Sequence, residues 1–242
     1  MNGITGPYAI RIFCDLLEVD KTFIRNCIPM EDFGGVPPDP CLKNAKDFYR
    51  LFSGNSKYDL GALSDGDGDR NVIIGKNFEL NSSDSLAILL YYSNTILKKD
   101  FILKGVGRSF PTSRAVDKVA EYLNIPIFET PAGWKFFANL LDKDLISICG
   151  EESFGHGSNH LREKDGLWAI LFWLNILAKT NKSLEQIVTE HWKKFGRFFY
   201  RRYDLEIFSV EDCKNIFENL NLKSIDNSLV KKYQIKKIKD FN

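Results

Sequence analysis

An acidic, glycine-rich loop is the segment of this sequence whose residue types are best suited to chemistry. It reads Asp65-Gly66-Asp67-Gly68-Asp69-Arg70, so three carboxylates alternate with glycines. The glycines let the backbone turn tightly enough for the carboxylates to face one point. Carboxylate oxygens without histidine or cysteine nearby are typical ligands of Mg²⁺, Ca²⁺ or Mn²⁺ rather than Zn²⁺. Three like charges so close together repel one another without a cation, so the loop predicts a hard-cation site.

Three other interpretations of this loop can be weighed from the sequence. An EF-hand requires glycine at its sixth position and glutamate at its twelfth, whereas counting from Asp65 gives Arg70 and Lys76, which excludes it. A haloacid-dehalogenase-like phosphatase has an Asp-x-Asp motif after an apolar strand. Asp65 and Asp67 imitate that motif weakly, since the preceding residues 59–64 are only moderately apolar. An acidic turn that binds nothing is the third alternative.

The elements that must position this loop follow from the spacing of apolar residues. From Ser83 onward, helical apolar patterns alternate with short β-rich runs. This alternation predicts an α/β fold with a mostly parallel sheet and helices on both faces. Ligands of such sheets bind at the carboxyl ends of the strands, so the loops after the strands are candidate ligand loops. The predicted strands are 58–63, 101–106, 125–128 and 145–149, and the predicted helices are 84–97, 113–123 and 134–141.

The segments before and after this alternation show other patterns. A turn-rich stretch at 31–40 separates two further predicted helices. Residues 164–178 are apolar nearly all round, which predicts a helix buried between layers. Ser183 and Gln186 have the spacing of a capping box at the start of the next helix. The remaining predicted elements are helices at 10–17, 42–53, 183–195 and 210–220 and strands at 198–208 and 233–238.

Composition excludes several classes of protein. The 242 residues are 44% hydrophobic, which allows a sizeable core. The 33 Lys and Arg residues nearly balance the 32 Asp and Glu residues, so nothing indicates a nucleic-acid partner or an acidic membrane surface. The longest apolar run, 166–178, is shorter than the ~20 residues of a membrane span and contains Asn175. The N-terminus lacks the pattern of a signal peptide, so a cytoplasmic location is predicted.

The sequence resembles the α-D-phosphohexomutases, and within them the eukaryotic-type phosphoglucomutases. The acidic loop is similar to their metal-binding loop, and the similarity covers nearly the whole chain in the family's order. The other segments that carry the resemblance are 31–35 (EDFGG), 111–113 (PTS), 129–137 (ETPAGWKFF), 150–155 (GEESFG) and 162–166 (REKDG).

The resemblance implies a division of the chain into parallel-sheet βαβ domains of phosphohexomutase type with a short α+β C-terminal stub. Residues 1–82 would be a partial second domain with the metal-binding loop. Residues 83–196 would be the third, sugar-binding domain, and residues 197–242 the start of the C-terminal domain. The family's serine loop and its fourth-domain phosphate loop have no counterpart in these 242 residues.

The resemblance also implies roles for the charged residues. Asp65, Asp67 and Asp69 would hold Mg²⁺, and the planar donors of Arg70 would suit the transferring phosphoryl group. Lys164 has the position of the family's proposed general acid or base. For both Arg70 and Lys164 the structural alternative is an ion pair with a neighbouring acid in the sequence.

The sugar would be recognised by two further loops. Glu151 and Ser153 resemble the family's contacts to sugar hydroxyls, with a helix-capping carboxylate as the alternative for Glu151. Ala132 and Gly133 lie where the family has a second sugar or phosphate loop that usually reads Thr-Gly. Ala132 has no hydroxyl, so one hydrogen bond expected there is missing.

Other polar and aromatic residues favour structural roles. His156 and His160 lack acidic or cysteine partners at ligand spacing, so they are interpreted as loop or surface histidines rather than a zinc site. Arg108 with Thr112 and Ser113 fits either an anion site or plain helix capping. Helical spacing predicts core packing for the aromatic residues Trp134, Phe136, Phe137, Trp168, Phe172 and Trp173.

The function that the resemblance implies is the interconversion of glucose 1-phosphate and glucose 6-phosphate through a phosphoserine enzyme. Because the serine lies outside these residues, we expect that this polypeptide does not turn over by itself. A noncatalytic metal-binding or interaction module and a dehalogenase-like phosphatase are the alternatives. The expected small-molecule partner is a sugar phosphate, with Mg²⁺ as cofactor, and the sequence indicates no particular protein partner.

Overall fold

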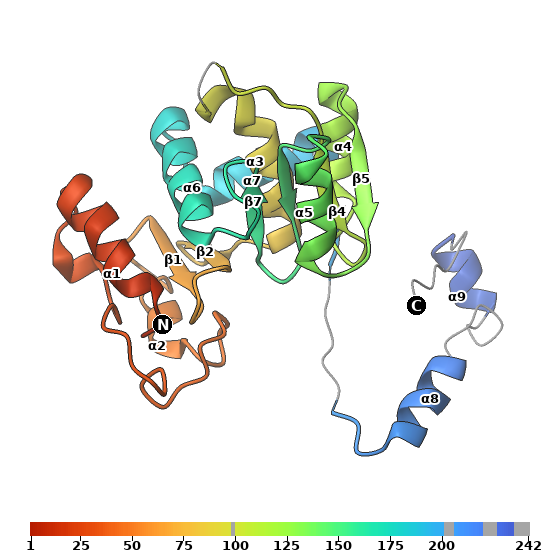
Figure 1. Cartoon of the computed structure of the whole chain (residues 1–242), viewed down its shortest axis with the longest axis horizontal. Helices are drawn as coiled ribbons and strands as arrows, with labels where there is room; N and C mark the ends of the chain where they lie inside the picture. Colours follow the sequence, from red (N-terminus) through yellow and green to blue (C-terminus); the bar gives the residue numbers. More distant parts are fainter. Residues whose placement is uncertain (98–99, 201–205, 220–226, 235–242) are drawn as a thin grey trace. The chain divides into compact units, whose positions relative to one another are not determined.

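The computed structural model describes residues 1–97, 100–200, 206–219 and 227–234. The chain divides into two compact units, Met1–Tyr200 and Arg201–Asn242 (Figure 1). All residues singled out above as candidates for chemistry belong to the first unit. Within the described residues, no helix has the length and apolar character needed to cross a membrane.

The sheet of the first unit that carries most candidate loops has four strands in the order β5-β4-β6-β7. Three of them are parallel, which confirms the predicted α/β fold, and β7 pairs with β6 in the antiparallel sense. Strand β7 was not predicted, because three residues are too short for a recognisable alternation. The strands are β4 (Val106–Ser109), β5 (Ile127–Thr130), β6 (Ile148–Gly150) and β7 (His156–Ser158).

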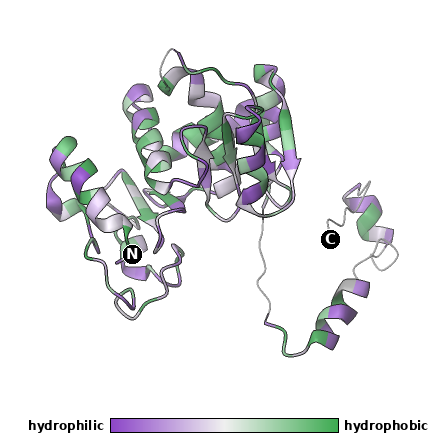
Figure 2. Cartoon of the chain, in the orientation of Figure 1, coloured by the Kyte–Doolittle hydropathy of each residue, from purple (hydrophilic) through white to green (hydrophobic). Residues whose placement is uncertain are grey.

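Helices cover both faces of this sheet because alternate strand residues point to opposite sides. Val106 and Ile148 pack with buried residues of α3 (Ser82–Ile96) and α4 (Ala115–Leu123). Cys149, the next residue of β6, packs instead with Phe137 of α5 (Trp134–Asp142). Hydrophobic residues accordingly gather on the sheet and its surrounding helices (Figure 2).

The strands begin later than their apolar patterns predict. Strand β4 was predicted at 101–106 and begins only at Val106. The hydroxyl of Ser147 accepts the backbone N–H of Lys104 and donates to the carbonyl of Ile102, at 2.9 Å each. The Ser147 side chain thus bonds backbone groups of residues 102 and 104 that a neighbouring strand would otherwise bond, and the strand begins only at Val106.

A second sheet precedes the four-stranded one and differs from the predicted parallel arrangement. Strands β1 (Leu60–Ser64), β2 (Asn71–Gly75) and β3 (Phe78–Glu79) form an antiparallel meander. The acidic loop 65–70 joins β1 to β2. A parallel pair requires a crossover of a dozen or more residues, so a loop this short makes β1 and β2 antiparallel.

Two helices that follow the sheets connect them to each other. Helix α6 (Gly166–Thr180) contacts β1, β2, β7 and α3, in agreement with the burial that its apolar sequence predicts. Helix α7 (Leu184–Phe195) begins at the predicted capping box, in which Ser183 and Gln186 bond each other's backbone. The N-terminal helices are shorter than predicted or distorted: α1 (Thr5–Ala9), the π-helical turn η1 (Ile10–Leu16), the 3₁₀ turn η2 (Lys21–Phe23) and α2 (Lys46–Arg50).

The second unit contains α8 (Val210–Asn219), which was predicted, and α9 (Asn227–Lys232), which was not. The strand predicted at 198–208 is absent from its described residues, 198–200 and 206–208, and its other residues lie outside the described part of the chain. Of the strand predicted at 233–238, residues 233 and 234 form a turn, and residues 235–238 lie outside the described part of the chain.

We expect the buried His191 of α7 to make folding stability depend on pH. It is 6% exposed, and both ring nitrogens lack a hydrogen-bond partner among the described residues. Burial, aided by the charge of Lys194, lowers its pKa to about 4. Below the unfolded pKa of about 6.5, only the unfolded chain takes up the proton, so stability is lost as the pH falls toward 4. Relative to His191→Leu, the wild type should lose about 1.4 kcal/mol per pH unit in this window.

Urea unfolding at pH 7, 6 and 5, followed by tryptophan fluorescence, measures this difference. Val188→Ala, which truncates a buried neighbour on the same helix, serves as the control because it removes no titratable group. A constant difference between wild type and His191→Leu across the pH series would contradict the expectation.

Candidate functional site

The acidic loop is held by the side chain of its own first aspartate. The Oδ1 atom of Asp65 accepts the backbone N–H groups of Gly68 and Arg70, at 3.1 Å each. Asp65 is only 6% exposed, so these bonds lie inside the fold. They close the loop between β1 and β2 into a turn that brings the next two carboxylates back toward Asp65.

The three carboxylates of this turn converge as the sequence predicts. Oxygen atoms of Asp65, Asp67 and Asp69 all lie within 4.8 Å of one another. The Oδ1 atom of Asp69 is buried without a hydrogen-bond partner. Burial, reinforced by the nearby carboxylates of Asp69 and Asp67, raises the pKa of Asp65 to about 7. An orphaned buried oxygen within a cluster of mutually repelling carboxylates fits a hard divalent cation.

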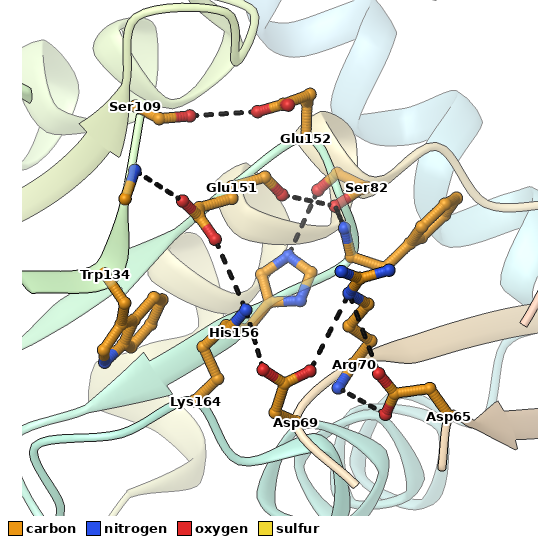
Figure 3. A network of polar contacts seen from close by, with 12 residues as sticks. Asp65, Asp69, Arg70, Ser82, Ser109, Trp134, Glu151, Glu152, His156 and Lys164 are labelled. Atoms are coloured by element: carbon orange, nitrogen blue, oxygen red, sulfur yellow. Dashed lines mark hydrogen bonds and ion pairs between the residues drawn. The ribbon is translucent and has the colours of Figure 1, made fainter. Parts of the chain in front are cut away.

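Arg70 ends the loop and forms ion pairs with Asp65 and Asp69 (Figure 3) and with Asp39. Its Nη1 atom lies 3.1 Å from Oδ1 of Asp39, and its Nε atom lies 3.7 Å from Asp65 and 3.8 Å from Asp69. Asp39 belongs to the proline-rich stretch that sequence patterns mark only as a turn, so it was not predicted as a site residue. The Arg70 side chain is 36% exposed, so it can meet an anion from solvent.

Lys164 connects the acidic loop to the loop after β6. Its ammonium nitrogen lies 2.7 Å from Oδ2 of Asp69 and 3.7 Å from Oε2 of Glu151 (Figure 3). Lys164 therefore forms ion pairs with acids of two other loops, not only with its sequence neighbours. Arg162, two residues earlier, pairs with Asp142 instead. Lys164 is thus the cation that the two candidate loops share.

Glu151 lies at the carboxyl end of β6 and also contacts the loop after β5. Its Oε1 atom accepts the backbone N–H of Gly133 at 3.4 Å. Gly133 has φ +122°, a conformation that other residues rarely adopt. In this conformation its backbone N–H points toward the carboxylate of Glu151. Ser153 is half-buried in the turn that follows Glu151, and Ala132 is exposed beside Gly133.

His156 and Arg108 differ from the roles that the sequence predicts for them, whereas His160 does not. His156 is not a surface histidine: it is 0% exposed on β7, and burial lowers its pKa to about 4. His160 is more exposed and lies 3.0 Å from Asp165. The Arg108 side chain is 3% exposed, and its guanidinium is bonded to Asp117 and Glu129, so it does not form the predicted anion site.

The arrangement combines three kinds of group in one place. A cluster of carboxylates that fits a divalent cation lies beside Arg70 and Lys164, whose charges suit an anionic group such as a phosphoryl. Glu151, on the other side of Lys164, offers acceptor oxygens to hydroxyl groups. These groups together can bind a phosphorylated, hydroxylated small molecule and a metal ion.

Comparisons with known proteins show which proteins this chain is similar to. Residues 82–195 match the model of the phosphoglucomutase/phosphomannomutase α/β/α domain III. Phosphoglucomutase-2 of Paramecium tetraurelia is 49% identical over 235 residues, which cover 92% of this chain and 41% of that protein. Human phosphoglucomutase-1 is 45% identical over 240 residues, covering 96% of this chain and 42% of that protein.

A solved structure gives the same result for the fold. The open form of a Paramecium phosphoglucomutase, parafusin, superposes with a TM-score of 0.83 at 47% identity and covers 96% of this chain and 42% of that chain. This chain therefore spans about two fifths of the length of the curated relatives it matches.

We expect Gly166 to control how closely α6 approaches the acidic loop. Its backbone N–H donates to the carbonyl of Gly68 at 3.0 Å. A Cβ atom here would lie 2.6 Å from the carbonyl oxygen of Arg70 and 2.8 Å from that of Gly68. Gly166→Ala should therefore push the helix and the loop apart and destabilise the unit by about 1–3 kcal/mol.

Urea unfolding of Gly166→Ala measures this cost. Ala178→Ser, at an exposed position near the other end of the same helix, is the matched control and should change stability by less than about 0.5 kcal/mol. Equal stability of the two variants would mean that the loop yields to the added methyl group without cost.

Proposed function

Because this chain is similar to phosphoglucomutases and its residues 82–195 match the model of their domain III, we propose that it forms part of a Mg²⁺-dependent phosphoglucomutase. The reaction would interconvert glucose 1-phosphate and glucose 6-phosphate through a phosphoserine that lies outside these residues. The observation that carries the proposal is the position of Lys164 between Asp69 of the acidic loop and Glu151 of the loop after β6. It brings together in space the groups that the phosphoryl and the sugar require.

Each group has a chemical task in this proposal. Asp65, Asp67 and Asp69 would hold Mg²⁺, which neutralises negative charge on a transferring phosphoryl group. Arg70 would turn its donors toward the phosphoryl oxygens, since its side chain is partly exposed. Lys164 would hold or release a proton at Nζ beside the reacting hydroxyl.

The sugar would be oriented by the loops after β5 and β6. Glu151 and Ser153 would bond neighbouring hydroxyl groups of the ring, and Gly133 would keep Glu151 in place through its backbone N–H. Ala132 would contribute no side-chain hydrogen bond. The proposed division into a partial second domain at 1–82, a sugar-binding domain at 83–196 and the start of a C-terminal domain at 197–242 accompanies these roles.

The dehalogenase-like alternative requires Asp65 to be a nucleophile. Its side chain is only 9% exposed, and its Oδ1 atom accepts two backbone N–H groups. A carboxylate bound in this way supports a turn better than it attacks a phosphorus atom.

We expect Mg²⁺ to bind this chain through the acidic loop. Asp67 is the exposed member of the cluster, so Asp67→Asn removes a ligand charge with little effect on packing. Isothermal titration calorimetry should show Mg²⁺ affinity weakened at least about tenfold in this variant, equal to about 1.4 kcal/mol. Asp47→Asn changes an exposed acid that pairs with Arg50 on α2 and should leave the affinity unchanged. Equal Mg²⁺ affinities of the two variants would contradict a metal site in the acidic loop.

We expect activity only when the missing parts of the enzyme are supplied. The chain alone, with glucose 1-phosphate, Mg²⁺ and glucose 1,6-bisphosphate, should form no glucose 6-phosphate. A chimera in which this chain replaces the matching segment of the Paramecium phosphoglucomutase should form it. Lys164→Met in the chimera should lower kcat by about 10²–10⁴-fold, because a general acid or base contributes that much.

The chimera also provides its own control. Lys118→Met removes an exposed lysine that pairs with Glu121 on α4 and should preserve kcat. A chimera that folds but forms no glucose 6-phosphate would contradict the proposed function. A Lys164→Met chimera with normal kcat would contradict the role of Lys164 alone.

A further inference from the structure

The acidic loop and the loop after β6 are joined by backbone as well as by Lys164. Arg70 and Gly155 form an isolated antiparallel bridge. The next residue, Asn71, donates its backbone N–H to the carbonyl of Phe154 at 3.0 Å. The first residues after the metal cluster therefore lie directly against the turn that follows Glu151.

The side chain of Asn71 adds two bonds to this junction. Its Nδ2 group lies 3.0 Å from the carbonyl oxygen of Phe154 and 3.0 Å from Nδ1 of His156. The other ring nitrogen of His156 lies 3.2 Å from the carbonyl oxygen of Ser82, which can only accept. His156 must therefore carry its proton on Nε2 and accept from Asn71 at Nδ1. Both amide hydrogens of Asn71 are then used.

The network continues to the backbone of Glu151. The hydroxyl of Ser82 donates to the carbonyl of Glu151 at 2.7 Å and accepts the backbone N–H of Phe154 at 3.1 Å. Phe154 has φ +71°, a left-handed conformation that is strained for a residue with a side chain. The surrounding bonds hold it there, and its carbonyl consequently faces Asn71.

We propose that Asn71 and His156 are a positioning pair that couples metal binding at the acidic loop to the conformation of the sugar loop, residues 151–156. This inference rests on the proposed function. Asn71 is two residues from Asp69, so any adjustment of Asp69 toward a cation shifts the backbone of Asn71. Asn71 transmits that shift to the strained Phe154 and, through His156 and Ser82, to the carbonyl of Glu151. The two loops then respond as one body.

Hydrogen exchange of the whole 242-residue chain, with and without Mg²⁺, tests this coupling. In the wild type, Mg²⁺ should slow exchange in peptides covering residues 151–156 by about tenfold, within the usual range of coupling between sites. In Asn71→Ala, Mg²⁺ should still bind in calorimetry but slow exchange there less than about twofold. A residue with only a structural role would change the exchange rate without changing its response to Mg²⁺.

Two further sets of variants separate coupling from general loss of stability. Ser147→Ala removes two hydrogen bonds of a fully buried hydroxyl near the start of β6, outside this network, and should keep the tenfold response. His156→Gln can still accept from Asn71 and donate to Ser82, so it should keep most of the response, whereas His156→Leu should lose it. The His156 variants also test the proposal if Asn71→Ala does not fold.

The outcomes are distinguishable. Mg²⁺ binding by the wild type without slower exchange in residues 151–156 would overturn the coupling and leave the proposed metal site intact. A full response in Asn71→Ala or His156→Leu would overturn the role of the pair. Failure of the wild type to bind Mg²⁺ would overturn the proposed function and the coupling with it.

Discussion

The packing of α6 between the three-stranded sheet and α3 is the constraint on which the site depends. Trp173 of α6 is fully buried and donates its indole N–H to Ser85 of α3, while Ile73 of β2 belongs to the same core. This packing fixes where the helix begins. Because Lys164 lies two residues before that beginning and Gly166 bonds the acidic loop, core packing places the cation that joins the two candidate loops.

Charge balance is the second requirement of the site. Acidic groups from the loop, the turn-rich stretch and the end of β6 surround Arg70 and Lys164. These ion pairs reduce the repulsion among carboxylates that the fold holds together. The two Lys164 pairs are mostly buried, so they are stronger than exposed pairs, and a carboxylate oxygen without a hydrogen bond is costly there. The orphaned oxygen of Asp69 and the raised pKa of Asp65 mark the position where positive charge is still lacking.

Local patterns in the sequence were sufficient for much of the fold and for the acidic loop. Alternating aspartates and glycines predicted the convergence of three carboxylates, because neighbours in a tight turn meet without help from the rest of the chain. The capping box of Ser183 and Gln186 and the helices of the α/β region followed from spacing within a few residues. The likeness to the phosphohexomutases, carried by long motifs in order, extended these patterns to Glu151 and Lys164.

Only the tertiary structure decided which distant side chains meet. Arg70 pairs with Asp39 across 31 residues, and Asn71 contacts His156 across 85 residues. Periodicity determines which face of an element is buried, but the partner of a polar group depends on how whole elements pack. The burial of His156 on a strand too short to detect is one result. The sequence by itself therefore determined the elements and the candidate ligands, whereas packing determined the contacts that join them into one site.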